Sequence, residues 1–243
     1  MKRLTLPLLL VASPALADTD LWLDAYGGHV SHETGTLSLY QDNLLSADNA
    51  AHFDFDPNLR PMNGLRLRVD TTPIPFGFGI DFGYTHVHDP RADLRLLPVT
   101  LGVTLPSDLT LARGSYGSLH PIGMVGFVVT AVDGFVRAGP IVSSVNDNTW
   151  SGRGGRLGAS ASLGLEWRLN PAISLFSEYR YQQMRFHLEH TNDPVLPTTR
   201  LETTGDIRND AILFGLTFRL LHQVSPTALR PATDGQAASP PST

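Results

Sequence analysis

The 243-residue sequence contains no cysteine, which excludes a disulfide framework, a thiol nucleophile and a cysteine-ligated metal. It contains one lysine, Lys2, so every basic residue beyond it is an arginine or a histidine. Arginine is the side chain that suits fixed, partly buried ion pairs. The formal net charge is −5 and the chain has no basic run, which argues against a nucleic-acid partner. Beyond residue 17, no stretch approaches the roughly 18 consecutive apolar residues of a membrane-spanning helix.

The first 17 residues have the layout of a secretory signal peptide. Lys2 and Arg3 form a positive region, Leu4 to Val11 an apolar region, and Ala15-Leu16-Ala17 a cleavage site. The alternative, a buried N-terminal helix, fits these three regions less well. We therefore expect export and a mature chain that starts at Asp18, with stability supplied by packing or by a membrane rather than by disulfides.

Alternation of apolar and polar residues with period two is the dominant pattern, and it predicts β-strands. In the clearest segment, Phe76 to His88, the side chains of Phe78, Ile80 and Phe82 share one face, opposite Gly79, Asp81 and Gly83. Similar segments cover Asp20–Gly28, Leu65–Asp70, Leu97–Leu105, Leu157–Leu169, Ala172–His187 and Ile212–Leu220, and Leu119–Val132 is strand-like with two apolar faces that leave its orientation open.

These eight segments predict an all-β fold, because no helical period competes with them. The expected connections are long polar loops at 29–63, 134–156 and 188–206, a short loop at 89–93, a link at 106–118 and tight turns at 71–74 and 170–172. Alternating short turns and long loops are typical of outer-membrane barrels. Residues 221–243 are rich in Pro, Ala, Ser and Thr, and we expect them to form a disordered tail.

The tight turn at Asn170-Pro171-Ala172 allows the strand register to be predicted. Outward residues are odd-numbered on both flanking strands, so the loop must hold an odd number of residues. A three-residue loop pairs Trp167 with Leu175, and it places Gly164 opposite Glu178 and Ser162 opposite Arg180. Small residues then face large charged ones, as a narrow barrel interior requires.

Alternation alone does not say whether the apolar face contacts lipid or the core of a soluble barrel. Lipid is favoured because the other face consists largely of Gly, Ser and Thr with few charges, and because eight strands leave an interior that side chains fill. Several segments are also long enough for the tilted strands of a barrel to cross a membrane. The aromatic residues at strand ends would form interfacial girdles. These residues are Trp22, Tyr84, Trp167, Tyr179 and Tyr181.

The segment LGASASLGLEWRLNPAISLFSEYRY at 157–181 resembles a hairpin of the outer-membrane β-barrel superfamily that includes the OmpA transmembrane domain and the neisserial opacity proteins. LRLLPVTLGVTL at 94–105 and AILFGLTFRL at 211–220 resemble it too. The resemblance covers most of residues 20–220 and implies an eight-stranded antiparallel up-and-down transmembrane β-barrel in the outer membrane of a Gram-negative cell. The chain departs from the pattern after Phe218, where a Pro-rich tail follows without a peptidoglycan-binding domain.

Inward-facing charges are the main candidates for a site. We expect them to form an ion-pair network that fills the interior, since a buried charge is costly unless it is paired. The alternative is a gated polar path for ions. The residues concerned are Arg66, Arg68, Asp81, Glu166, Arg168, Glu178, Arg180 and Arg219.

Metal and catalytic patterns are weak. His86 and His88 share one outward strand face but are too few ligands for a metal. The stretch 54–58 begins like a calcium loop, but Leu59 and Leu65 stand where an EF-hand requires Gly and Glu. His187, Glu189 and His190, with Ser143 or Ser144, are the only residues that suggest a triad. We therefore predict no catalytic, cofactor-binding or metal site.

The predicted function is that of an integral outer-membrane barrel with a structural or surface-interaction role. The alternatives are a narrow channel or small-solute conduit, and a lipid A-modifying enzyme. Expected partners are outer-membrane lipid, lipopolysaccharide and a surface ligand held by the external loops. The chain is expected to be a monomer.

Overall fold

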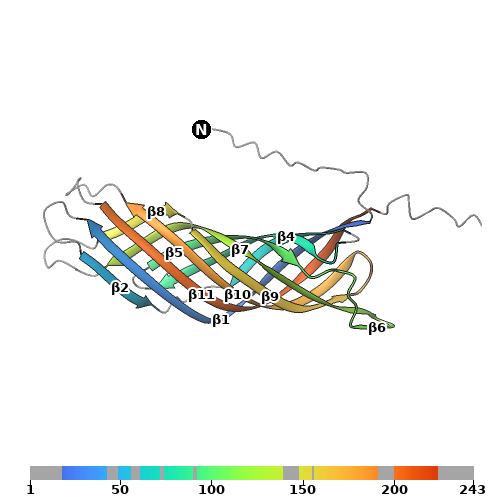
Figure 1. Cartoon of the computed structure of the whole chain (residues 1–243). Coiled ribbons are helices and arrows are strands. Elements are labelled where there is room, and N and C mark those ends of the chain that lie inside the picture. The colour runs from blue at the N-terminus through green and yellow to red at the C-terminus, as the bar shows by residue number, and fades with distance from the viewer. Residues whose placement is uncertain are drawn as a thin grey trace, which may run out of the picture.

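The protein is a closed antiparallel β-barrel, described here from a computed structural model (Figure 1). The structure describes residues 18–42, 49–55, 61–71, 74–89, 92–138, 148–154, 156–190 and 200–223. Among these residues there is no helix long and apolar enough to cross a membrane. The predicted signal peptide and all but the first residues of the predicted tail lie outside the described residues.

Eight strands close the barrel in the order β11-β10-β9-β7-β5-β4-β3-β1, with β11 pairing β1. Their bounds are β1 Thr19–Asp42, β3 Met62–Thr71, β4 Gly77–Asp89, β5 Ala92–Thr104, β7 Gly117–Ala138, β9 Arg156–Arg168, β10 Ile173–His190 and β11 Arg200–Gln223. Three short strands pair at the ends of longer ones: β2 Asn49–Phe55 with β1, β6 Ala112–Gly114 with β7, and β8 Asn148–Gly154 with β7. The eight-stranded antiparallel fold predicted from the sequence is confirmed.

The two ends of the barrel differ. One end, which we call the base, carries Thr19 paired with Gln223 and the short strand β6. The opposite end, the crown, carries β2 and β8, as Figure 1 shows. Because strands of an antiparallel barrel connect alternately at its two ends, all three long predicted loops fall at the crown.

The crown contains much more strand than predicted. β1 continues to Asp42, β7 to Ala138 and β10 to His190, so large parts of the predicted loops at 29–63, 134–156 and 188–206 are paired strands. The loop boundaries were wrong because these segments are rich in polar residues, which are common in loops as well. The strands continue through them by backbone pairing. At the base, β11 runs to Gln223, beyond the predicted start of the tail.

The register predicted at the 170–172 turn is confirmed. Trp167 pairs with Leu175, Gly164 with Glu178 and Ser162 with Arg180. The Asn170 side-chain oxygen closes the turn by accepting hydrogen bonds from the backbone N–H groups of Ala172 and Ile173, at 2.8 and 2.9 Å. Asparagine is suited to this role because its short side chain reaches backbone groups two and three residues further on.

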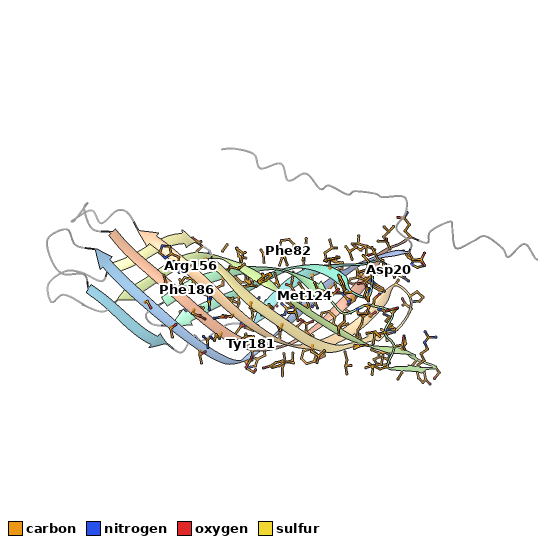
Figure 2. The ribbon with its side chains drawn as sticks, viewed as in Figure 1. Asp20, Phe82, Met124, Arg156, Tyr181 and Phe186 are labelled. Atoms are coloured by element: carbon orange, nitrogen blue, oxygen red, sulfur yellow. The ribbon has the colours of Figure 1, made fainter. Side chains whose placement is uncertain are left out.

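The two faces of the barrel wall have opposite polarity, as predicted. On β4 the side chains of Phe78, Ile80 and Phe82 are exposed, whereas Asp81 is 3% exposed. Figure 2 shows Phe82 and Tyr181 on the outside of the barrel. The same outward apolar face, which we call the belt, runs around the barrel. It includes Leu65, Phe76, Tyr84, Leu97, Leu101, Val103, Val125, Phe127, Val129, Leu157, Leu163, Leu165, Trp167, Leu175, Tyr179, Ile212, Phe214, Leu216 and Phe218.

One feature of the two faces contradicts the prediction, and another settles a point that the sequence left open. Trp22 was expected in an outer girdle, but it is 2% exposed and points into the barrel, in phase with Asp24 and Tyr26. The orientation of β7, which the sequence left open, has Val125 and Phe127 outside and Val128 inside. Both faces of β7 are apolar because its inner face packs against other apolar side chains.

Replacing Gly164 with valine should disrupt the barrel. A Cβ at Gly164 would lie 2.6 Å from the Cα of Glu178 and closer still to the Ser177 carbonyl oxygen. Such overpacking costs roughly 1–3 kcal/mol. We therefore expect Gly164→Val to unfold at a lower urea concentration than wild type. A gel on which folded and unfolded protein migrate differently measures this. Ala161→Val, on the outward face of the same strand, is the control and should behave like wild type. Equal losses in both variants would contradict the assigned register.

Candidate functional site in the barrel interior

The half of the interior nearer the base is filled by charged residues, which we call the polar tier. Its members are buried or nearly buried and come from β1, β3, β4, β9 and β10. Four arginines balance four carboxylates, so the tier is neutral. It consists of Asp24, Tyr26, Arg66, Arg68, Asp81, Glu166, Arg168, Glu178 and Arg180.

The charges of the polar tier alternate in sign along one continuous chain of contacts. Glu166 lies between two arginines: Arg168 Nε donates to its Oε1 and Arg68 Nη2 to its Oε2, each at 3.0 Å. Arg68 also contacts Asp24, with Nε 3.0 Å from Oδ2. The other neighbour of Asp24 is Arg66, whose Nε donates to the same oxygen at 2.8 Å. Thus no two carboxylates are neighbours in the chain.

Arg66 continues the chain across the barrel. Its Nη1 donates to Glu178 Oε2 at 2.8 Å. Glu178 in turn accepts from Arg180 Nη2 at 2.6 Å, and Arg180 Nη2 reaches Asp81 Oδ2 at 2.7 Å. The Tyr26 hydroxyl closes the end by donating to Asp81 and accepting from Arg180 Nη1. Charge-assisted bonds of this kind are the strong hydrogen bonds of proteins.

Trp22 forms the floor of the polar tier at the base. The guanidinium carbons of Arg168, Arg219 and Arg68 lie 4.7, 5.0 and 5.9 Å from its ring centroid, within the range of cation–π attraction. Arg219 is held there by Asp20, with Nη2 2.6 Å from Oδ2. Three cations around one ring explain why this tryptophan lies inside rather than at the membrane interface.

The half of the interior nearer the crown is apolar, and we call it the apolar tier. Its side chains come from all eight barrel strands except β9, and each is at most 4% exposed. They belong to one cluster of buried apolar side chains, which continues beside the polar tier through Leu213, Ile122 and Phe176. Two hydroxyl side chains, Thr85 and Thr130, are buried in the same half, but none of the tier's members is ionised. The members are Val30, Met62, Val87, Leu94, Leu96, Val128, Val132, Met184, Phe186 and Ile207.

Glycines make room for the largest rings in this interior. A Cβ at Gly205 would collide with the ring of Phe186, and one at Gly64 with the ring of Tyr26. Large side chains on one strand therefore fit against bare backbone on the neighbouring strands. The two tiers fill the interior in series along the barrel axis.

Most of the predicted interior residues are where the sequence placed them. Seven of the eight predicted charges belong to the polar tier, and the eighth, Arg219, pairs with Asp20 at the base instead. Asp24 and Tyr26 were not named as members. Their positions on the first strand, on the face opposite Leu23, already indicated that both side chains point inward.

The histidines at the crown end of β4 are held by a carboxylate. Asp93 on β5 lies 2.7 Å from His86 Nε2 and 3.4 Å from His88 Nδ1. The hydrogen bond from His86 holds the pKa of Asp93 below its ordinary value. Among the described residues no three His, Cys, Asp or Glu side chains form a group that could hold a metal.

The other residues singled out from the sequence are not placed. The side chains of the calcium-like stretch 54–58 lie outside the part of the structure that is described. So do the side chains of Glu189, His190, Ser143 and Ser144, which the sequence suggested for a triad. A different serine–histidine contact occurs at the base, where Ser118 Oγ is 2.7 Å from His120 Nε2 and His120 Nδ1 is 2.6 Å from the Leu109 carbonyl. His120 is 5% exposed, and we assign this contact a structural role that fastens the 106–116 link to β7.

The arrangement defines a class of fold: a narrow eight-stranded barrel that is charged inside and apolar outside. No protein-family model and no curated protein matches the chain in sequence. Solved structures do match. OprG, an outer membrane protein of Pseudomonas aeruginosa, is 13% identical with a TM-score of 0.53, and the match covers 84% of this chain and 96% of OprG. Neisserial surface protein A matches with 10% identity, a TM-score of 0.42, and coverage of 82% and 96%.

The chain therefore has the fold of the outer-membrane β-barrels, as the resemblance in the sequence implied. At 13% identity the likeness to OprG extends to the fold alone.

Removing one charge from the middle of the polar tier should be strongly destabilising. Arg66→Met takes one of two arginine partners from Asp24 and from Glu178 and leaves the tier with one negative charge that is not compensated. An uncompensated buried charge costs about 3–5 kcal/mol. Unfolding in urea, followed by tryptophan fluorescence, should move to clearly lower concentration. Arg95→Met, at an exposed arginine, is the control. Adding Asp24→Asn to Arg66→Met restores neutrality and should recover part of the loss; a variant as stable as the control would contradict the network.

Proposed function

We propose that this protein is an integral outer-membrane β-barrel with a closed interior, and that it acts through its surfaces in a structural or surface-interaction role. The observation that carries the proposal is the pair of tiers that fill the barrel from base to crown. In a barrel without an open channel, function depends on the outer wall, the crown and the base.

Insertion in a membrane is supported by the belt. Monomeric soluble proteins seldom expose contiguous apolar patches beyond a few hundred Å². Along β4 and the residue before it, the belt runs from Phe76 to Tyr84, about the length that a tilted strand needs to cross the hydrocarbon region. The charged residue within this stretch, Asp81, faces inward. Water on the outside would favour the opposite arrangement.

The orientation follows from the connections. Outer-membrane barrels have short turns on the periplasmic side and long loops outside, so the base faces the periplasm and the crown faces the medium. An N-terminal signal peptide would deliver the chain to this compartment. The extended strands β1, β7, β10 and β11 then carry the crown beyond the belt, where it would meet a ligand or partner at the cell surface.

The alternatives require features that the described interior does not supply. A channel or solute conduit needs a path through both tiers, and every member of the apolar tier is at most 4% exposed. A lipid A-modifying enzyme needs a nucleophile and base at the outer rim, and the residues suggested for that role lie largely outside the described part of the chain.

Fractionation tests the location. The chain should sediment with outer membranes and migrate anomalously on a gel until it is boiled, because a folded barrel resists the detergent. Recovery from the soluble periplasm, or identical migration before and after boiling, would contradict the proposal.

Planar-bilayer recording tests the closed interior. We expect no steady ion current from the wild-type protein, because ions would have to cross the apolar tier. Single variants Phe186→Ala and Arg66→Ala should also stay closed, since the other tier remains, and the combined variant should conduct if it folds. A porin of known conductance serves as the positive control. Steady current through wild type would favour the channel alternative.

A further inference from the structure

The outer wall between the belt and the crown has an excess of positive charge on one side. Three exposed arginines lie there on three neighbouring strands: Arg156 on β9, Arg185 on β10 and Arg208 on β11. The register places Arg185 beside Arg156 on one flank and beside Asp206 on the other, with Arg208 next to Gln183. We call this group the arginine patch.

The Asp206 carboxylate holds two of these arginines, each by its Nε atom. Arg185 Nε lies 3.2 Å from Asp206 Oδ2, and Arg208 Nε lies 3.6 Å from Asp206 Oδ1. Gln183 Nε2 donates to Asp206 at 2.7 Å and steadies it. Among the described residues, the terminal nitrogens of both guanidinium groups make no hydrogen bond. They are the atoms that bind a phosphate in bidentate fashion.

Arg156 adds a third cation, and it makes no ion pair with any residue that the structure describes. Two carboxylates lie on the same outward face, Asp206 and, two residues beyond Arg208, Asp210. The three arginines therefore leave the patch with an excess of one positive charge. The side chains of Arg185 and Arg208 are 50% and 58% exposed. A ligand with more than one negative charge would therefore find fixed, accessible donors here.

The surface directly below the patch suits acyl chains. Tyr181 and Tyr179 are exposed on β10, and Figure 2 shows Arg156 nearer the crown than Tyr181. On β9 the exposed side chains of Ala159 and Ala161 are short, and the register sets them beside Phe127 and Tyr181 respectively. A hydrocarbon chain can lie over the alanines and contact aromatic rings on either side.

The opposite side of the wall lacks this excess. There the exposed Arg95 stands opposite Asp133 in register, and Asp93 pairs with His86 and His88. The arginine at this height on β5 therefore has a carboxylate opposite it on β7. The patch on β9–β11 is therefore a local feature of the wall, and not a ring of charge around the whole barrel.

We propose that the arginine patch binds the phosphates of a phosphorylated glycolipid of the outer leaflet, with the acyl chains of the lipid against the alanines and tyrosines of β9 and β10. This rests on the proposed function, since it requires the crown to face outward. Two phosphates on a sugar backbone match several guanidinium groups spread over three strands. A phospholipid with a single phosphate would engage fewer of them.

Native mass spectrometry of the full chain, folded in detergent, tests this with diphosphorylated lipid A as the probe. Wild type should retain lipid A. The double variant Arg185→Gln/Arg208→Gln should bind it about tenfold more weakly or worse, because it loses charge-assisted hydrogen bonds to phosphate. Arg95→Gln, on the matched side of the wall, is the control and should bind like wild type. Dephosphorylated lipid A should bind wild type as weakly as diphosphorylated lipid A binds the double variant.

Each other outcome counts against the assignment. Equal retention of phosphatidylglycerol would mean a general anionic-lipid surface, and competition by millimolar inorganic phosphate would mean a site for the anion alone. Equal losses in the control and double variants would place binding elsewhere. Every sample is first checked for heat-modifiable migration: a folded barrel without bound lipid A overturns this proposal only, whereas failure to fold into detergent or membrane contradicts the proposed function.

Discussion

The structure depends on a chain of alternating charges that crosses the inside of the barrel from Arg168 to Asp81. Each carboxylate in it contacts at least one arginine, so the cost of removing eight charges from water is offset by short contacts in a medium of low dielectric constant. The contacts join β9, β3, β1, β10 and β4, strands that are far apart in sequence. A slip of one residue in any of them would turn a charged side chain outward toward lipid and leave its partners unpaired. The network therefore specifies the closed barrel as well as filling it.

The outer wall and the interior impose complementary demands on each strand. Backbone groups in a barrel are satisfied between strands, which leaves the side chains free to match their surroundings. Most outward positions in the belt are apolar, and several inward positions are glycines that lie against bulky side chains. The pairing of Gly164 with Glu178, and the contact of Gly64 with the Tyr26 ring, show how a narrow barrel accommodates side chains that would otherwise collide.

The interior is divided into two tiers of different chemistry. Near the base, charges neutralise one another around Trp22, and near the crown, apolar side chains pack as in the core of a soluble protein. The first tier is filled by paired charges, and no member of the second is ionised. An interior filled in this manner directs attention to the outer surface, where the arginine patch and the strands of the crown are the most distinctive features.

Much of this could be predicted from the sequence. Alternation with period two assigned inward and outward faces for all strands but β7, and the odd-residue argument at Asn170 gave the correct β9–β10 register. Seven inward charges were correctly assigned to one network. Local pattern is sufficient for these because successive side chains of a strand point to opposite faces of the barrel wall.

Other features could not be predicted, because they depend on which strands become neighbours. Trp22 was assigned to the girdle by its residue type, but its position is set by three arginines from β3, β9 and β11. The orientation of β7 is decided by the apolar tier, and the length of the crown strands by backbone pairing with their neighbours.

The sequence by itself determined the fold class and the polarity of the two faces, since both follow from short-range periodicity. Only the tertiary structure decided which charges pair, that the buried side chains form two tiers, and that three arginines gather on one side of the wall. These depend on contacts between residues distant in the chain, which barrel closure brings together.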